Sequence, residues 1–161
     1  MTKNEYYEMV MGAFAPAATL VNMAPADKLD WRPGPTFMSL GQLIYHLSEG
    51  LGGALELTES EKWPSMEEME PGMKLENLPS CGVPEALDRL EKDKAVLRRA
   101  LDSISEEEYT NKVVTVPWGW TAKIERMSLS FLEHFTNHKM QLFTYLKLLG
   151  APVNTGTLYG A

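Results

Sequence analysis

Apolar side chains recur every three or four residues in four segments of the chain, the spacing typical of amphipathic helices. The first segment covers residues 2–24, the second begins at Ser39 and extends beyond Leu51, the third covers 84–103 and the last covers 121–149. In each segment polar residues occupy the opposite face. We therefore expect an all-α protein in which four helices bury their apolar faces together as a four-helix bundle.

Residues that favour helix ends stand at several of these boundaries. Ser39 and Gln42 have the spacing of a capping box, Pro84 falls in the first turn of the third helix, and Gly150 ends the last one. The second segment also contains three residues that each weaken a helix by about 1 kcal/mol relative to alanine. They are Gly50, Gly52 and Gly53. That cost is tolerable where another element approaches closely, or where the helix frays into the wall of a pocket.

Two long connections separate the helices. Residues 60–83 form an acidic, proline-containing connection. We interpret it as a solvated loop whose methionines (Met66, Met69 and Met73) cover the bundle, with contact to a partner as the alternative. At ~3.3 Å per residue it can travel the full length of a bundle, so it permits the second and third helices to run parallel. Residues 105–120 include a β-like run at 113–116 and a turn at 117–120.

Composition narrows the class of protein. The chain has 161 residues, 44% of them hydrophobic and 23% charged, which suits one globular domain over residues 1–161. The net charge of −7 argues against nucleic-acid binding, which needs clustered Lys and Arg. We expect no membrane association, because no uncharged apolar run approaches ~18 residues and the N-terminal segment lacks a positively charged start. The single cysteine, Cys81, cannot form an internal disulfide, and we expect a bystander thiol and a cytoplasmic protein.

The three histidines are the residues that suggest chemistry. His134 and His138 are four residues apart in the last helix, so both imidazoles point the same way. His46 lies in the second helix, and from a facing position its imidazole completes a three-nitrogen site with open coordination positions. We therefore predict a divalent metal held by His46, His134 and His138. Zn²⁺ and Ni²⁺ are favoured, and Fe²⁺ and Mn²⁺ stay open.

Other metal sites fit the sequence less well. The zincin motif requires Glu after the first histidine, and Phe135 stands there. A ferritin-like di-iron site requires Glu-x-x-His on two helices, whereas Glu133 is adjacent to His134 and points elsewhere. A two-histidine, one-carboxylate iron site stays open only if an acid such as Glu49 joins. The alternative without a metal is a set of core histidines satisfied by hydroxyls or carbonyls.

Polar and aromatic residues near the histidines are candidates for supporting the site. Each ligating imidazole should donate its other N–H to an acceptor, and Gln42 and Glu49 are candidates for His46. Gln141 and Tyr145 continue the ridge of His134 and His138, and we consider them for orienting substrate. Two further residues, Trp118 and Trp120, can line a pocket mouth, although we prefer to interpret them as packing anchors.

Two stretches of the sequence resemble the DinB superfamily. They are Ser39-x-x-Gln-Leu-Ile-Tyr-His46-Leu, preceded by Trp31-Arg-Pro, and His134-x-x-x-His138-x-x-Gln141-Leu-x-x-Tyr145-Leu-x-x-x-Gly150. The resemblance implies a four-helix bundle of up-down-down-up topology, with a long crossover between helices two and three, that forms homodimers. It also implies that His46, His134 and His138 bind a divalent metal. Related enzymes are metal-dependent transferases and isomerases that use low-molecular-weight thiols.

These observations lead to two hypotheses of function. The first is a metal-dependent enzyme, a thiol-dependent S-transferase or a hydrolase, acting on a small molecule. The alternative is a non-catalytic metal- or ligand-binding protein related to stress, in which the metal is structural. No compact Arg/Lys cluster in the sequence is clearly placed to hold an anionic thiol.

Overall fold

The computed structural model describes residues 1–160 and is mostly helical. Eight α-helices are assigned within these residues: α1 (Lys3–Asn22), α2 (Leu40–Ser48), α3 (Leu51–Ser60), α4 (Met66–Met73), α5 (Val83–Ser103), α6 (Glu106–Asn111), α7 (Ile124–Leu148) and α8 (Thr155–Tyr159). Two 3₁₀ turns (Ala26–Lys28 and Leu75–Asn77) and two short strands, β1 (Val113–Thr115) and β2 (Thr121–Lys123), complete the described elements. The prediction of a mainly helical protein is confirmed, with a short β-hairpin in addition. No helix within residues 1–160 is both long and apolar enough to cross a membrane.

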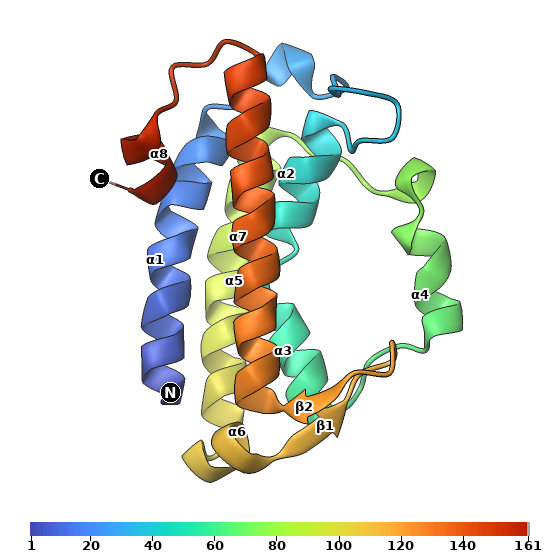
Figure 1. Cartoon of the computed structure of the whole chain (residues 1–161), viewed down its shortest axis with the longest axis vertical. Helices are drawn as coiled ribbons and strands as arrows, with labels where there is room; N and C mark the ends of the chain where they lie inside the picture. The colour runs from blue at the N-terminus through green and yellow to red at the C-terminus, as the bar shows by residue number, and fades with distance from the viewer. Residues whose placement is uncertain (161) are drawn as a thin grey trace.

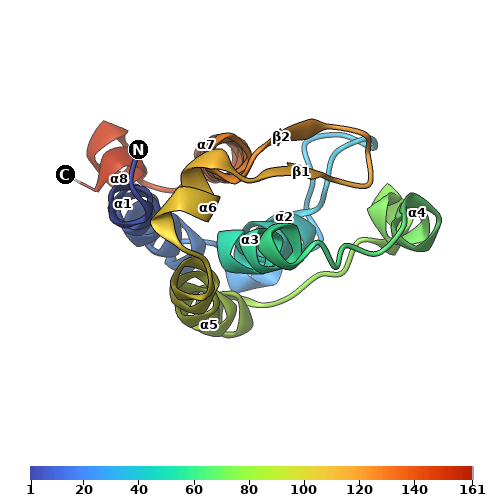
Figure 2. The same ribbon diagram turned by 90° about the horizontal axis from the view of Figure 1, so that it is seen from below.

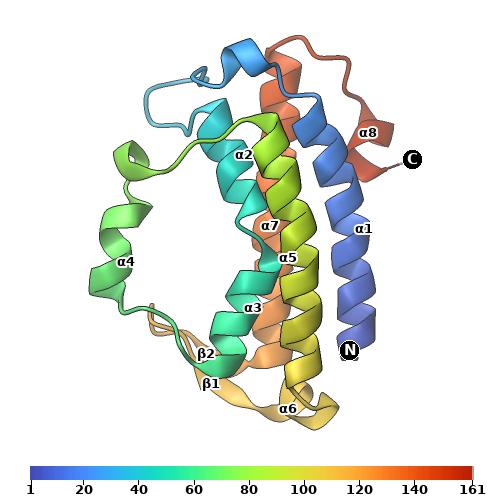
Figure 3. The same cartoon turned by 180° about the vertical axis from the view of Figure 1, so that it is seen from behind.

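The long helices pack around one apolar core. α1 contacts α5 and α7, and the α2–α3 pair contacts the same two helices from the other side. In Figure 1, α1 and α7 run upward from their N-terminal ends, whereas α2, α3 and α5 run downward. The chain between α3 and α5 therefore returns along the outside of the bundle, where it carries α4 (Figure 3). Buried side chains from every long helix, among them Phe14, Leu43, Leu97 and Leu146, fill the interior.

The connection after α3 differs from the loop expected there. Residues 66–73 form a helix, because the Ser65 side chain accepts from the Glu68 N–H and the Glu68 carboxylate accepts from the Ser65 N–H. α4 stands away from the bundle (Figure 2) and buries none of its residues. Met66 and Met73 are 37% and 64% exposed, so neither is buried against the bundle as predicted, although Met73 lines the cavity described below.

The start of the last helix was also placed too early. Residues 121–123 are extended and pair with residues 113–115 in an antiparallel hairpin, with Val114 opposite Ala122. The β-like run at 113–116 needs a partner for its backbone groups, and the turn at 117–120 returns the chain beside it. Gly119 takes a positive φ of 84° in this turn, a conformation that favours glycine. α7 therefore begins at Ile124.

Candidate metal centre

The second predicted helix is broken, and the break shapes the site. α2 ends at Ser48 and α3 begins at Leu51, with Gly50 at a φ of +94° between them. A side chain at Gly50 would overlap the Asp93 carboxylate. That carboxylate accepts from the Gly52 N–H at 3.0 Å and the Gly53 N–H at 3.2 Å, so it caps the N-terminus of α3. The glycines thus allow the close approach of another element, one of the two explanations considered from the sequence.

Asp93 departs from the expectation that the polar residues of the third helix lie on the face opposite the core. It projects from α5 toward α3 and is only 6% exposed. Burial raises the pKa of its carboxyl group, and the hydrogen bonds from the α3 backbone oppose that change. Periodicity along α5 alone gave no sign that a carboxylate belongs inside. The signal lay in the partner segment, where clustered glycines leave backbone N–H groups open to a buried acceptor.

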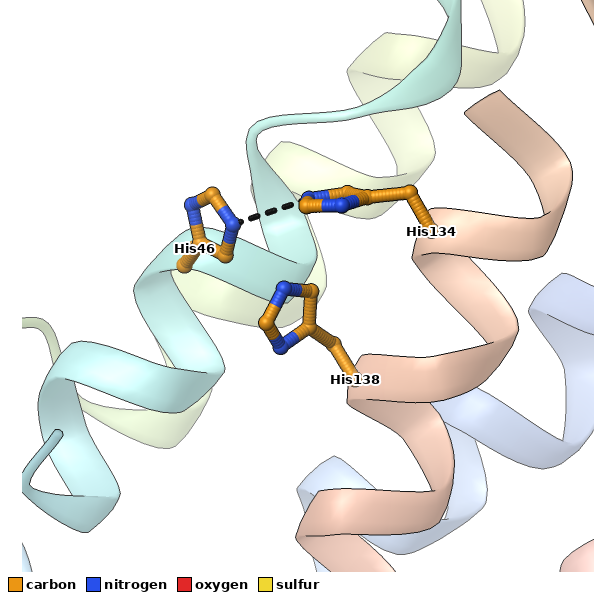
Figure 4. Close-up of side chains that lie close together, drawn as sticks. All are labelled: His46, His134 and His138. Atoms are coloured by element: carbon orange, nitrogen blue, oxygen red, sulfur yellow. Dashed lines mark hydrogen bonds between the residues drawn. The ribbon is translucent and has the colours of Figure 1, made fainter. Parts of the chain in front are cut away.

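The three histidines come together at the end of α2. Figure 4 shows His46 on α2 facing His134 and His138 on α7. The ring centroids are 5.2 Å apart for His46 and His134, 4.6 Å for His46 and His138, and 4.5 Å for His134 and His138. One potential ligand atom from each residue lies within 4.8 Å of the other two. The convergence expected from sequence is therefore present in the fold.

The nitrogen spacing suits a shared metal ion. The Nε2 atoms of His46 and His134 are 3.1 Å apart. Two nitrogen ligands at 2.0–2.1 Å from a tetrahedral ion are separated by about 3.4 Å, so a small rotation of either ring reaches that spacing. Three neutral nitrogen donors are a ligand set that zinc and nickel accept. The residues present therefore fit a divalent metal.

A carboxylate behind His46 determines which of its nitrogens faces the site. Nδ1 of His46 lies 3.0 Å from Oε2 of Glu49. An ionised carboxylate only accepts, so Nδ1 carries the proton and Nε2 presents its lone pair. Glu49 is thus confirmed as one of the two candidate partners, and Gln42 is not a partner. The Gln42 amide instead donates to the carbonyls of Leu75 and Leu78, which ties the crossover connection to α2.

A chain of hydrogen bonds orients His138 in the same way. The Met38 carbonyl accepts from the Tyr145 hydroxyl at 3.0 Å, so the Tyr145 oxygen is left to accept from the Gln141 amide at 3.3 Å. The Gln141 carbonyl oxygen then faces Nδ1 of His138 at 3.0 Å, and that nitrogen must donate. The lone pair of His138 is therefore on Nε2. The Trp31 and Tyr145 rings pack edge to face with their centroids 5.4 Å apart, which helps to fix the Tyr145 ring.

These contacts correct the role considered for Gln141 and Tyr145. Tyr145 is only 2% exposed, and neither residue lines the cavity described below. Both act behind His138 rather than on a substrate. No hydrogen bond is found for Nδ1 of His134 within residues 1–160, and this histidine is the exposed member of the three.

Two of the imidazoles are held in the neutral state that metal binding requires. His134 is the most exposed of the three, but packing against the protein still removes part of its hydration. This desolvation, with smaller contributions from His138 and His46, lowers the pKa of His134 from 6.5 to about 4. Burial also lowers the pKa of His138, and the hydrogen bond that its Nδ1–H donates to the Gln141 carbonyl oxygen partly opposes the change. Near pH 7 both imidazoles are therefore neutral, and each has one nitrogen with a lone pair for a metal ion.

The histidines open onto a cavity of about 640 Å³ between α2–α3 and α7. Its wall is mainly apolar and includes Leu57, Trp63, Trp118, Trp120 and Phe131. Trp118 and Trp120 both line the cavity, which agrees with the alternative considered for them. The preferred interpretation as packing anchors does not fit Trp118, which is 47% exposed, whereas Trp120 also packs against the core. Trp63 was not identified as a site residue from the sequence. It reaches the cavity wall because it follows the end of α3 by three residues.

Comparison with known proteins assigns the family. The model of the DinB superfamily matches residues 15–142, a range that contains all three histidines. The chain belongs to the DinB superfamily. No curated protein is similar enough to this chain to count as a match.

Two solved structures of DinB-like proteins share the fold. A DinB-like protein from Bacillus cereus ATCC 10987 is 13% identical, with a TM-score of 0.73 over 95% of this chain and 96% of the other. A protein from Exiguobacterium sibiricum 255-15, put forward as a member of the DinB family, is 22% identical, with a TM-score of 0.72 over 96% of each chain. At these identities the likeness concerns the fold alone.

Proposed function

We propose that this DinB superfamily protein is a divalent-metal-dependent enzyme that acts on a small molecule, with His46, His134 and His138 as the metal ligands. The convergence of three imidazoles at an open cavity carries the proposal. A structural site closes its coordination sphere with protein atoms, whereas three ligands beside a cavity leave room for another molecule. The exposure of His134 supports a centre that a small molecule can reach.

The residues around the centre have separate tasks in this proposal. A bound divalent ion supplies a Lewis acid that lowers the pKa of a coordinated water or thiol. Glu49 and Gln141 hold the rings of His46 and His138 with Nε2 toward the centre. The aromatic wall excludes bulk water from the reacting groups. Zn²⁺ and Ni²⁺ are the ions we favour for nitrogen donors.

The reaction we propose is transfer of a thiol to an electrophile, or hydrolysis with water as the attacking molecule. In the transfer, the thiol sulfur forms a bond to an electrophilic carbon. The leaving group departs with the electron pair of the bond that breaks, and the thiol proton passes to solvent. Hydrolysis follows the same balance with a water oxygen in place of sulfur. A homodimer and a cytoplasmic location stay predictions.

Metal analysis of purified, unsupplemented protein tests the ligand set. We expect about one divalent ion per chain in the wild type and loss of most of it in His138→Ala. Asn137→Ala, an exposed neighbour on α7, is the matched control and should retain the metal. Equal metal content in wild type and His138→Ala would show that the histidines are not ligands.

Activity is then tested on protein loaded with Zn²⁺ or Ni²⁺. Thiol conjugation is followed with panels of electrophiles, and ester hydrolysis is followed in parallel. The control is the metal-free protein. Turnover that requires both the metal and His138 supports the enzyme. Metal binding without turnover in either panel contradicts it and leaves the non-catalytic alternative.

A further inference from the structure

The cavity above the histidines has an aromatic wall built from three separate parts of the chain. Trp63 follows α3, Trp118 lies in the β1–β2 turn, and Phe131 is one turn before His134 on α7. The Trp63 and Trp118 rings meet edge to face, with centroids 5.2 Å apart and planes at 81°. The ring centroids of Trp63 and Phe131 are 6.4 Å apart. These are the separations at which aromatic rings attract one another, so the wall is an ordered surface for a further ring.

Trp63 is held in place by a hydrogen bond outside the cavity. Its indole N–H donates to the Thr58 hydroxyl at 3.2 Å, and Thr58 is 1% exposed. The polar edge of the ring is therefore satisfied, and its apolar faces are free to contact Trp118, Phe131 or a ligand. A ring fixed in this way loses little side-chain entropy when a ligand binds.

The charge of the lining is the second observation. The ionisable or hydroxyl-bearing side chains that line the cavity are His46, Glu49, Ser130, His134 and His138. None of the lining residues within 1–160 is Lys or Arg. A carboxylate or phosphate on the body of a ligand would lose its water here without a guanidinium or ammonium partner, which is costly. The single acidic side chain, Glu49, would add repulsion.

We propose that the centre takes a small molecule with one metal-binding head group and an uncharged aromatic body, which packs against Trp63, Trp118 and Phe131. The inference rests on the proposed metal centre and specifies its substrate class. The volume of about 640 Å³ is that of a site for a small organic molecule. Neutral imidazoles leave the charge of the ion uncompensated, so one anionic head such as a thiolate is accommodated. A second negative group on the body has no partner.

Binding of matched thiols to Co²⁺-substituted protein tests this selectivity. Benzyl mercaptan and 4-(mercaptomethyl)benzoate differ only in a carboxylate on the ring, and ethanethiol lacks the ring. The near-ultraviolet charge-transfer band of cobalt–thiolate ligation reports binding of each one. We expect benzyl mercaptan to bind at least tenfold more tightly than either of the others. Equal affinities, or tighter binding of the carboxylate, would overturn the proposal.

Two exposed aromatic residues provide the variant and its control. Trp118 and Phe37 are each 47% exposed, and only Trp118 lines the cavity. Trp118→Ala should weaken benzyl mercaptan about tenfold and leave ethanethiol unchanged. Phe37→Ala should change neither affinity. If Trp118→Ala weakened the binding of both thiols equally, the metal centre itself would be disturbed. If it weakened the binding of neither thiol, the aromatic contact would be refuted.

A metal-free experiment separates this inference from the proposed function. Benzyl alcohol and 4-(hydroxymethyl)benzoate are titrated into metal-free protein, and tryptophan fluorescence reports their binding. A preference for the neutral ring without metal supports the aromatic wall even if Co²⁺ fails to bind, in which case the proposed function alone has failed. Co²⁺ binding with no preference in either titration refutes the substrate class and leaves the metal centre standing.

Discussion

Two neighbouring glycines in α3 provide a matched test of the packing behind the metal centre. A Cβ added at Gly52 would overlap the backbone nitrogen of Leu97 and lie 2.7 Å from the Asp93 carbonyl oxygen, both in α5. A Cβ added at Gly53 would meet nothing within 4 Å. Both residues lie in the first turn of the same helix, and both N–H groups donate to Asp93. The structure therefore predicts opposite effects for the same substitution.

The expected magnitudes follow from two terms. Replacing a helical glycine by alanine stabilises by about 0.5–1 kcal/mol, because the unfolded chain becomes less flexible. That term applies at both positions and cancels in the comparison. At Gly52 the new methyl group meets the α5 backbone, which cannot rotate away, and overpacking costs about 1–3 kcal/mol. We expect Gly53→Ala to be more stable than the wild type and Gly52→Ala to be about 1–3 kcal/mol less stable than Gly53→Ala.

Urea unfolding of the metal-free proteins, followed by circular dichroism, measures this difference. The slope with urea should be the same for all three proteins, so that the midpoints compare their free energies of unfolding. In a chain of this length the difference corresponds to roughly 2–4 °C in Tm for each kcal/mol. If Gly52→Ala were as stable as Gly53→Ala, the close approach of α3 to α5 would be wrong, and so would the position that it gives to His46.

Three further predictions concern the site, the thiol and pH. Gln141→Leu removes the acceptor of His138 and should lower metal affinity about 10–100-fold in calorimetric titrations, whereas Asn137→Ala should not. Burial raises the pKa of Cys81 from 9.0 to about 11. At pH 8 iodoacetamide should therefore alkylate Cys81 at least ~100-fold more slowly in the folded protein than in the urea-unfolded protein. Equal alkylation rates in the two states would contradict this prediction. The pKa of His134 is about 4 in the folded state and 6.5 unfolded, so between these values the unfolded state binds the extra proton and the metal-free protein loses stability as pH falls. Tm measured at pH 7 and pH 5 should fall less in His134→Gln than in the wild type, and an equal fall would refute the assignment.

Helix starts could be predicted where the signal is local. The capping box at Ser39 and Gln42 was found in the sequence and is present in the structure. The same pattern at Ser65 and Glu68 marks α4, and the equivalent pair at Ser105 and Glu108 marks α6. Both were overlooked because the flanking segments are acidic and lack an apolar stripe. Short exposed helices depend on their caps, so a search for caps alone would have found them.

The metal centre was predictable in part. The four-residue spacing of His134 and His138 on one helix face follows from helix geometry. Glu49 and Gln141 each follow a histidine by three residues, which is also a helical neighbour distance. The aromatic wall could not be predicted from the sequence, because Trp63, Trp118 and Phe131 come from three separate parts of the chain that only the fold brings together.

The sequence by itself determined the helical class and the shared face of His134 and His138, because both depend on contacts within one or two helical turns. The structure decided between Gln42 and Glu49 as the partner of His46 and identified Gln141 as the partner of His138. Only the tertiary structure decided where the second helix breaks, since Asp93 on α5 supplies the cap that ends its continuity at Gly50. It also decided that residues 121–123 are a strand, because the backbone groups of residues 113–115 are satisfied by them. Packing of α2 against α7 brings His46 to the other two histidines, and no pattern within one segment contains that contact.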